Sequence, residues 1–263
     1  MQSVVVVGAG LSGICIGIKL KQAGIHDFVI LEKAQEVGGT WRENQYPGVA
    51  CDVPSHLYSY SFEQNPEWSK TYSCGQEIQD YCVRCTDKYD IRQHIRFGVE
   101  IKQGTFDGQC WRLTSSDGDV FASQALVLAI GGLHTPSYPE IKGLSGFEGR
   151  MFHSAKWDTQ YDVQDKSVAI IGSAASAVQI VPGIVDRVKS LQVFQRTANW
   201  ILPRHEKVYS AWAKALFRYV PGLQRAYRWL IYWLLEWRVS VFLKPGSFWS
   251  RTVRRLALAY LEE

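Results

Sequence analysis

Ten residues near the amino terminus, Val4–Gly13 (VVVVGAGLSG), join an apolar strand to three glycines spaced as GxGxxG. A strand that turns through glycine directly into a helix leaves backbone N–H groups at the helix start, where a pyrophosphate can bind. Gly8 would make the tight turn, Gly10 would let the phosphates approach, and Gly13 would let helix and strand pack closely. Glu32 follows Gly8 by 24 residues, where an acid accepts hydrogen bonds from a ribose. The pattern predicts a site for an adenine dinucleotide.

The elements that must position this site are short and regular. We expect a helix from Leu11 to Ala23 that ends at Gly24, and a second apolar strand from Phe28 to Leu31 that Glu32 closes. A later strand, Ala125–Ile130, is entirely apolar and ends at two glycines. We expect it to be buried and to return to the first sheet, with glycine backbone beneath the ligand.

The same pattern recurs later in the chain. We expect a strand over Lys166–Ile171, a turn at Gly172, a helix over Ala174–Val185 and a strand over Leu191–Gln195. Arg196 follows Gly172 by 24 residues, so the two motifs have the same register and opposite charge. Arginine binds a 2′-phosphate with paired hydrogen bonds, which predicts NADPH at the second site. The alternative is that Arg196 is a solvated strand end.

The second turn departs from the glycine pattern. It reads Gly172-Ser173-Ala174-Ala175-Ser176-Ala177, with alanine where close approach normally needs glycine. A methyl group there would push the pyrophosphate outward and weaken binding by about 1 kcal/mol, by analogy with small overpacking costs.

Three further segments have features that bear on chemistry. Gly38 and Gly39 make a second close backbone approach before Thr40 and Trp41, and the loop Tyr46–Phe62 is rich in aromatic residues, Pro and Gly. That loop either packs on a flat group or is only a structural loop pinned by its aromatics. The expected helix Gln76–Tyr89 contains Cys82 and Cys85. Because a mid-helix pair lacks both an exposed helix start and further metal ligands, we interpret these cysteines as structural and predict no metal site.

Composition narrows the class of protein. The chain has 263 residues, 46% of them hydrophobic and 21% charged, which is ordinary for a globular protein. We see no signal peptide, and the apolar run Trp229–Leu235 is too short to span a bilayer. Six scattered cysteines suit a reducing compartment, so we expect an intracellular, cytoplasmic protein. Nothing indicates a nucleic-acid partner.

A fingerprint lies between the two dinucleotide motifs. Phe147, Gly149, His153, Trp157 and Asp158 have the spacing FxGxxxHxxxWD. This pattern resembles that of type I Baeyer-Villiger monooxygenases, and GGTW, YPGVACD and FQRTANWILPR elsewhere in the chain are similar to the same family. The resemblance is close over residues 1 to about 204 and loose beyond.

The resemblance implies two α/β Rossmann-like dinucleotide-binding domains, for FAD and NADP, with a helical insertion. It implies an FAD domain that begins with residues 1–145 and is incomplete in this chain, the first part of an NADP domain over 146–204, and an insertion over 205–263. The FAD-binding residues would be Gly8, Gly10, Ser12, Gly13, Glu32, Gly39, Thr40, Trp41, Asp52, Tyr58 and Ile101. The NADPH-binding residues would be Gly172, Ser173, Ser176, Arg196 and Thr197.

The resemblance also implies a reaction. In that family NADPH reduces the flavin, O₂ adds to give a flavin peroxide, and attack on a ketone yields an ester or lactone. Asp52 would act at the catalytic site by orienting an arginine expected beyond Glu263, whereas His153 and Trp157 would couple the two domains. Asp52 could instead only cap its loop. Two other functions stay open: oxygenation of nitrogen or sulfur, and nucleotide binding without turnover.

The last part of the chain differs in character. Residues 205–263 hold ten Lys and Arg against four acids, although the whole chain has a net charge of only +4. Trp229, Trp233 and Trp237 recur every four residues and would lie on one helix face. A basic helix with an aromatic face can bind a membrane interface. We favour a lid over the substrate cavity, and expect the three indoles to be partly exposed in this chain.

Overall fold

The computed structural model describes residues 1–132, 134–197, 204, 206–242, 251–252, 254–255 and 257–258. The chain forms two compact units. Unit 1 consists of Met1–Tyr46 and Gly75–Tyr161, and unit 2 of Pro47–Cys74 and Asp162–Glu263.

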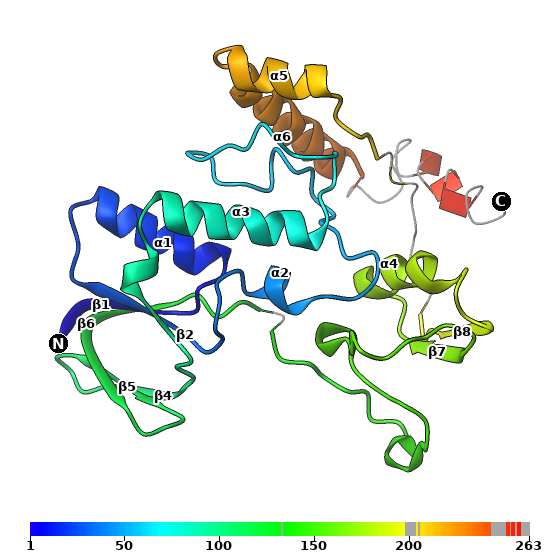
Figure 1. Ribbon diagram of the computed structural model, residues 1–263, viewed down its shortest axis with the longest axis horizontal. Helices are drawn as coiled ribbons and strands as arrows, with labels where there is room; N and C mark the ends of the chain where they lie inside the picture. Colours follow the sequence, from blue (N-terminus) through cyan, green and yellow to red (C-terminus); the bar gives the residue numbers. More distant parts are fainter. Residues whose placement is uncertain are drawn as a thin grey trace. The chain divides into compact units, whose positions relative to one another are not determined.

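Unit 1 is built on a six-stranded sheet (Figure 1). Its strands, in spatial order, are β3 (Ile95–Phe97), β2 (Phe28–Glu32), β1 (Gln2–Val7), β6 (Val120–Leu128), β5 (Trp111–Ser115) and β4 (Ile101–Phe106). The first four strands pair in parallel, and β5 and β4 extend the sheet as antiparallel strands. The parallel part requires crossover connections, which α1 (Leu11–Gln22) and α3 (Gly75–Lys88) provide.

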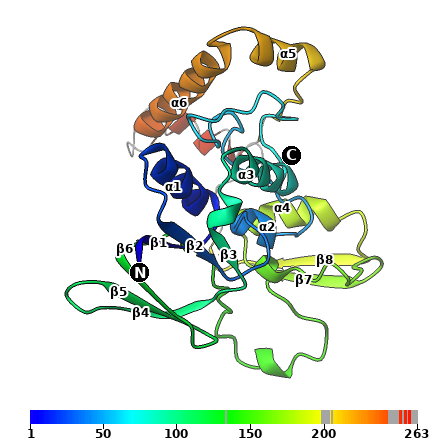
Figure 2. The same ribbon diagram turned by 60° about the vertical axis from the view of Figure 1, so that its left-hand side comes forward.

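Side chains that alternate along β1 and β2 form two apolar layers. On the face that carries α1 and α3 (Figure 2), Ile14 and Ile18 of α1 are fully buried, and Gly17 of α1 lies so close to Ile30 that an added Cβ would be 2.9 Å from its Cδ1. The other face is covered by a cluster of Val5, Val29, Leu31, Leu113 and Phe121. The start of the first repeat is therefore anchored on both sides of the sheet.

Short helices complete unit 1. They are α2 (Thr40–Glu43) and the 3-10 turns η1 (Arg92–His94), η2 (Leu144–Gly146) and η3 (Ser154–Lys156).

The named elements of unit 2, among the residues that the structure describes, are two parallel strands and the helices α4 (Ala175–Ile184), α5 (Ala211–Tyr219) and α6 (Leu223–Phe242). The strands β7 (Ser167–Ile171) and β8 (Ser190–Phe194) are joined through α4. The helices α5 and α6 contact each other. In the described part of the chain, no helix is long and apolar enough to cross a membrane.

The predicted α/β class and the two strand–turn–helix–strand repeats are confirmed, and the helices and strands of the repeats begin and end within one or two residues of their predictions. The strand predicted over Ala125–Ile130 starts earlier, at Val120. The expected burial of Ala125–Ile130 is wrong. That segment pairs with β1 as predicted, but Leu128 and Ile130 are 64% and 56% exposed. Among the described residues, no element packs over these two side chains. The prediction failed because an apolar sequence shows only that a strand could be buried, not that another element covers it. The domain boundaries at 145 and 204 stay predictions.

Candidate functional site

The first glycine turn is closed to side chains by its own backbone. Gly8 has φ +101°, and a Cβ there would lie 2.6 Å from the carbonyl oxygen of Ala129. A Cβ on Gly13 would lie 1.9 Å from the carbonyl oxygen of Gly8, far inside van der Waals contact. Gly10 and Gly39 also approach closely, because a Cβ on Gly39 would be 3.1 Å from the Gly10 Cα. The turn is therefore bare backbone.

The helix start at this turn suits an anion. Gly10 is the N-cap residue of α1 and gives no side-chain cap, and the first turn of α1 contains no acid. Ser12 is exposed on that turn. No negative side chain of that turn therefore compensates the helix dipole or accepts from its amide groups. A helix start of this kind can bind a pyrophosphate.

Glu32 closes the site from the end of β2. Its side chain is buried, and its Oε2 accepts a 2.8 Å hydrogen bond from the Ala9 N–H inside the glycine turn. Its Oε1 accepts from the Ala34 N–H at 2.9 Å and from Arg42 Nη1 at 3.4 Å. An ionised carboxylate has about four acceptor positions, so one remains, on Oε2 beside the turn. A ribose hydroxyl can donate to it.

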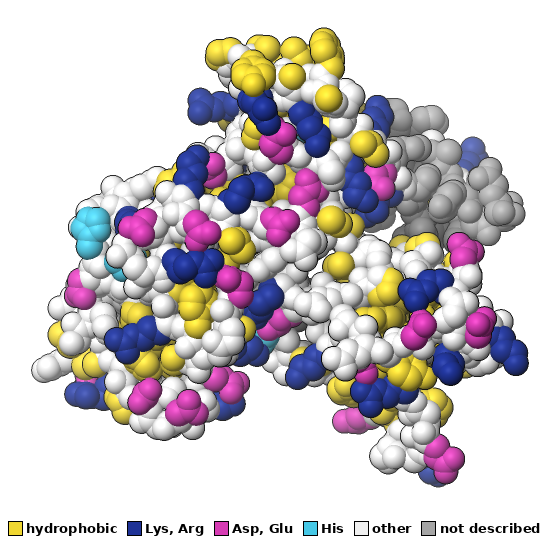
Figure 3. All heavy atoms as spheres, viewed as in Figure 1, with side chains coloured by type: hydrophobic (Ala, Val, Ile, Leu, Met, Phe, Trp, Pro, Cys, Tyr) yellow, Lys and Arg dark blue, Asp and Glu magenta, His cyan; other side chains and the backbone are white. Residues whose placement is uncertain are grey.

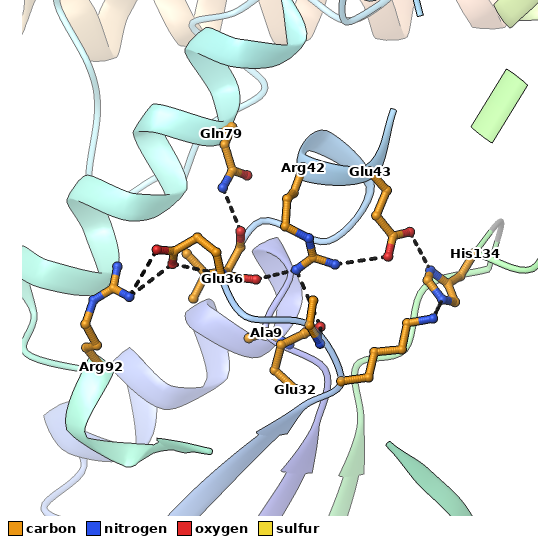
Figure 4. A network of polar contacts seen from close by, with 11 residues as sticks. Ala9, Glu32, Glu36, Arg42, Glu43, Gln79, Arg92 and His134 are labelled. Atoms are coloured by element: carbon orange, nitrogen blue, oxygen red, sulfur yellow. Dashed lines mark hydrogen bonds and ion pairs between the residues drawn. The ribbon is translucent and has the colours of Figure 1, made fainter. Parts of the chain in front are cut away.

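Arg42 belongs to a polar network that the sequence analysis did not identify (Figure 4). Besides Glu32, its guanidinium donates to the backbone oxygen of Glu36 and, at 3.0 Å, to Glu43 Oε1. Glu43 Oε2 in turn lies 2.9 Å from His134 Nδ1. The alternating charges at 42 and 43, directly after the GGTW segment, are the only sequence signal for this network. Thr40 and Trp41 lie in the same helix, α2, with Thr40 exposed and Trp41 half-buried.

The loop that carries Asp52 docks on α4 within unit 2. Gln179 uses both ends of its side-chain amide there: Oε1 accepts from the Ala50 N–H at 3.1 Å, and Nε2 donates to the Ala50 oxygen at 3.0 Å. Gly48 lies so close to the α4 backbone that an added Cβ would be 2.5 Å from the Gln179 oxygen. Gln179 was also missed, although an amide in the apolar run ASAVQIVPGI could have suggested it.

Asp52 itself is exposed, and within the described residues its carboxylate accepts no hydrogen bond. The alternative that Asp52 caps its loop is therefore not supported by the structure. Its neighbour Cys51 is buried, and burial raises the pKa of the Cys51 thiol to about 11. A protonated thiol of this kind packs as an apolar group.

A second contact holds the following turn, which includes Tyr58. Arg228 of α6 donates from Nη1 to the backbone oxygens of His56 at 2.9 Å, Leu57 at 2.8 Å and Ser59 at 3.2 Å. From the sequence, Arg228 is one of the basic residues that would supply positive charge around the tryptophan face, but in the structure its guanidinium binds these loop carbonyls. Arg228 lies one position before Trp229, so on the helix its side chain points inward to these carbonyls.

His56 packs between the same two segments. Its ring lies 5.1 Å from that of Tyr209, 4.4 Å from that of Phe217 and 5.3 Å from that of Tyr227. Burial lowers the pKa of His56 to about 4, because the aromatic surroundings do not solvate an imidazolium.

The second glycine turn repeats the first in its backbone. Gly172 has φ +111°, and the N-cap residue Ala174 has φ −77° and ψ −173°, against −77° and −171° for Gly10. This extended conformation suits alanine, so the substitution strains nothing. The first turn of α4 also has no acid and no side-chain cap. Ser173 and Ser176 are half-buried on this turn.

The two repeats differ by one residue in strand register. Val7 pairs with Leu31 in the first, whereas Ile171 pairs with Phe194 in the second. The residue that follows the second pair is Gln195, so Gln195 and not Arg196 occupies the strand position of Glu32. The equal count of 24 was misleading because the second connection is one residue shorter. Arg196 and Thr197 are exposed just beyond β8.

The fingerprint residues form a local turn in unit 1. The exposed Phe147 ring lies over Gly149, where a Cβ would be 2.6 Å from it. His153 Nδ1 accepts from the Ala155 N–H at 3.1 Å and so caps η3. Asp158 pairs with Arg150 at 2.5 Å, and hydrogen bonding from Arg150 lowers the pKa of Asp158. The coupling role of His153 and Trp157 stays a prediction.

Other predicted residues fall in the hydrophobic interior. Cys82 and Cys85 are buried in the middle of α3, and burial raises the pKa of Cys82 to about 12, as expected of structural thiols. Ile101 packs against the Val5 cluster, and its proximity to an adenine stays a prediction.

The tryptophan face of α6 is exposed, as predicted. Trp229, Trp233 and Trp237 are 54% to 59% exposed, and the first two rings stack at 6.3 Å. Figure 3 shows hydrophobic side chains gathered on the surface of α5 and α6. The lid and the membrane interface both stay predictions for this face. The FQRTANWILPR segment lies largely outside the described residues.

Comparison with known proteins places this arrangement in a family. Residues 5–219 match the pyridine nucleotide-disulphide oxidoreductase family, and the chain belongs to it. A Baeyer-Villiger monooxygenase of Pseudomonas aeruginosa is 42% identical over 262 residues, which cover 99% of this chain and 50% of that protein. The resemblance predicted from the fingerprint is thereby confirmed.

Solved structures agree. Cyclohexanone monooxygenase from Rhodococcus sp. Phi1 bound to NADP+ is similar with a TM-score of 0.78 and 31% identity, over 86% of this chain and 44% of that one. A complex of OTEMO with FAD and NADP is similar with a TM-score of 0.76 and 32% identity, over 82% and 44%. The chain spans about half the length of the curated relatives it matches.

Proposed function

We propose that this chain binds FAD at the first repeat and NADPH at the second, and serves an enzyme that uses O₂ to oxidise a ketone to an ester or lactone. The observation that carries the proposal is the pair of turns at the positive-φ glycines Gly8 and Gly172, each followed by a helix without a side-chain cap, with the FxGxxxHxxxWD fingerprint between them. Relatives named as Baeyer-Villiger monooxygenases and a similar structure that holds FAD and NADP support it.

The first repeat fits an adenine dinucleotide. Gly8 and Gly13 let the turn and helix pack against backbone, Gly10 would let the phosphates approach, and the remaining acceptor position of Glu32 would receive a ribose hydroxyl. Gly39, Thr40 and Trp41 would line the same ligand from the second close approach. When bound, FAD and NADPH supply the hydride transfer and the activation of O₂.

The second repeat would bind NADPH through the backbone of its glycine turn and through the positive charge of Arg196. Gly172, Ser173 and Ser176 would contact the pyrophosphate, and Arg196 and Thr197 would contact the 2′-phosphate. Because Arg196 lies beyond the strand end and is exposed, we propose that it reaches the phosphate as a solvated, charge-assisted donor.

Asp52 would act on a catalytic arginine. Its exposed carboxylate, carried on a loop that Gln179 and Arg228 hold at either side, would orient that arginine and balance its charge at the flavin edge. In the enzyme, Asp52→Ala should slow ketone oxygenation far more than it changes FAD retention. Loss of FAD with unchanged turnover per bound flavin would instead make Asp52 a structural residue.

The decisive test is product analysis. Purified protein is supplied with FAD, NADPH, O₂ and either a cyclic ketone or a thioether. Lactone from the ketone supports the proposal, whereas sulfoxide alone favours the sulfur- or nitrogen-oxygenating alternative. Bound flavin without NADPH oxidation would favour nucleotide binding without turnover, and a protein that binds neither FAD nor NADPH would overturn the proposal altogether.

A further inference from the structure

We propose that Arg42 is a positioning residue for the adenosine ribose of FAD: it occupies one oxygen of Glu32 so that the other is presented to the ribose. This inference rests on the proposed FAD site. Arg42 would not contact the ligand itself and would act on it through Glu32.

The two carboxylate oxygens of Glu32 accept different numbers of hydrogen bonds. Oε1 receives two donors, the Ala34 N–H at 2.9 Å and Arg42 Nη1 at 3.4 Å. Oε2 receives one, the Ala9 N–H at 2.8 Å. Three of about four acceptor positions of the carboxylate are therefore taken. A ribose hydroxyl can donate only to the remaining position, which is on Oε2 beside the glycine turn where the pyrophosphate would bind.

Charge gives Arg42 a second effect on the same group. The Glu32 side chain is only 6% exposed and that of Arg42 only 17%, so the ion pair is largely removed from water. A buried carboxylate with no cation nearby costs several kcal/mol, and two N–H donors compensate it only in part. Arg42 therefore compensates the charge that the Glu32 carboxylate would carry in its buried position.

The guanidinium is itself held in place. It donates to the backbone oxygen of Glu36 and to Glu43 Oε1 at 3.0 Å, and Glu43 is held by His134 at 2.9 Å. These contacts, visible in Figure 4, come from the segment after β2, from α2 and from the segment after β6. Arg42 thus has little freedom to leave Glu32, which a positioning role requires.

Arg92 provides a matched control. It is also an arginine of unit 1 in the same network, but it pairs with Glu36 at 3.1 Å and with Asp87 at 2.9 Å and does not contact Glu32. Removal of its charge disturbs the network without changing the acceptor that would face the ribose.

The experiment measures binding of two ligands by flavin fluorescence: FAD, and an FAD analogue whose adenosine ribose lacks its hydroxyl groups. Wild-type protein should bind FAD about 10-fold or more tightly than the analogue, since a hydrogen bond to a charged group is worth about 1.5 kcal/mol or more. Arg42→Gln should weaken FAD binding by about 10-fold and change analogue binding much less. Arg92→Gln should leave both dissociation constants within about 2-fold.

Several outcomes would overturn the inference. If Arg42→Gln weakens both ligands equally, Arg42 only supports the fold; if it weakens neither, Arg42 has no role in binding. If the Gln variant fails to fold, as judged by its circular dichroism, Arg42→Lys is compared in the same way. A lysine that keeps the charge should preserve part of the preference for FAD, and equal losses for both ligands would again contradict the proposal. Wild-type protein that binds no FAD would overturn the proposed site itself, a result distinct from any of these.

Discussion

The two repeats of this chain have the same order of strand, glycine turn and helix, but they differ in how closely the turn packs on its surroundings. Both place a positive-φ glycine between a parallel strand and a helix that starts without a side-chain cap. At the first, Gly13 touches the backbone of Gly8, and the acid at the next strand end is buried with three protein donors. At the second, Ala177 takes the place of Gly13, and Arg196 is exposed.

The difference indicates how each site would hold its ligand. The first has its acceptor fixed by backbone and by Arg42 before any ligand arrives, as suits a cofactor that stays bound. The second presents an exposed cation and few fixed contacts, as suits a cosubstrate that exchanges. Of four measurements, the first and third compare the two repeats directly, and the others test the contacts that support them.

The largest expected effect is at the helix–strand contact. Gly13→Ala should lower the free energy of unfolding by at least about 3 kcal/mol, because the new methyl group meets a backbone oxygen that cannot move aside. The counterpart Ala177→Gly should cost only about 1 kcal/mol, the helix propensity difference. Urea unfolding of both variants checks this. Equal losses would show that the two contacts are equally tight after all.

Acid should act on unit 2 through His56. Its folded pKa of about 4 lies below the unfolded value of 6.5, so the unfolded chain binds the proton first, and stability present above pH 6.5 is lost as the pH falls toward 4. The loss should be about 3 kcal/mol. The rings of Tyr209, Phe217 and Tyr227 pack around this imidazole, and Gln224 Nε2 lies 3.3 Å from its Nδ1, so no charged side chain contacts the ring within the described residues.

The check is urea unfolding at pH 7 and pH 4 for the wild type and for His56→Phe. The variant should lose most of this pH dependence while keeping the ring packing. An identical pH dependence in both proteins would assign the acid sensitivity to other groups.

Cofactor choice tests the register difference. Arg196→Glu should weaken NADPH binding by about 10- to 100-fold and spare NADH, because a charge-assisted pair worth about 1.5 to 3 kcal/mol is lost. Gln195→Glu places an acid at the strand position of Glu32 and should have the smaller effect on NADPH. Titration with both nucleotides decides. A larger effect at Gln195 would mean that strand register, not the exposed arginine, sets the specificity.

The smallest expected effects come from two glutamines that brace loops. Gln179 satisfies both backbone groups of Ala50, so Gln179→Leu should cost about 1 to 2 kcal/mol. Gln79 donates to the Val37 oxygen at 2.7 Å, but within the described residues its buried Oε1 has no partner. Gln79→Leu should therefore be nearly neutral in the free energy of unfolding. The reverse order in thermal melts would contradict this assignment.

The sequence by itself determined the local parts of this protein. The turns at Gly8 and Gly172, the helices after them and the strand that ends at Glu32 were all predicted, because each depends on a few adjacent residues and on the periodicity of apolar side chains. The glycine positions were predictable for the same reason, since a positive φ or a close approach is a property of one residue and its neighbours.

Only the tertiary structure decided which residues support the site. Gln179 meets Ala50 across 129 residues of sequence, and Arg228 meets Leu57 across 171. The assignment of Gln195 to the position of Glu32 required the pairing of β7 with β8, which a count along the chain does not reveal. Such contacts depend on where packed elements place polar groups that have lost water, and that placement results from the whole fold and not from any short stretch of sequence.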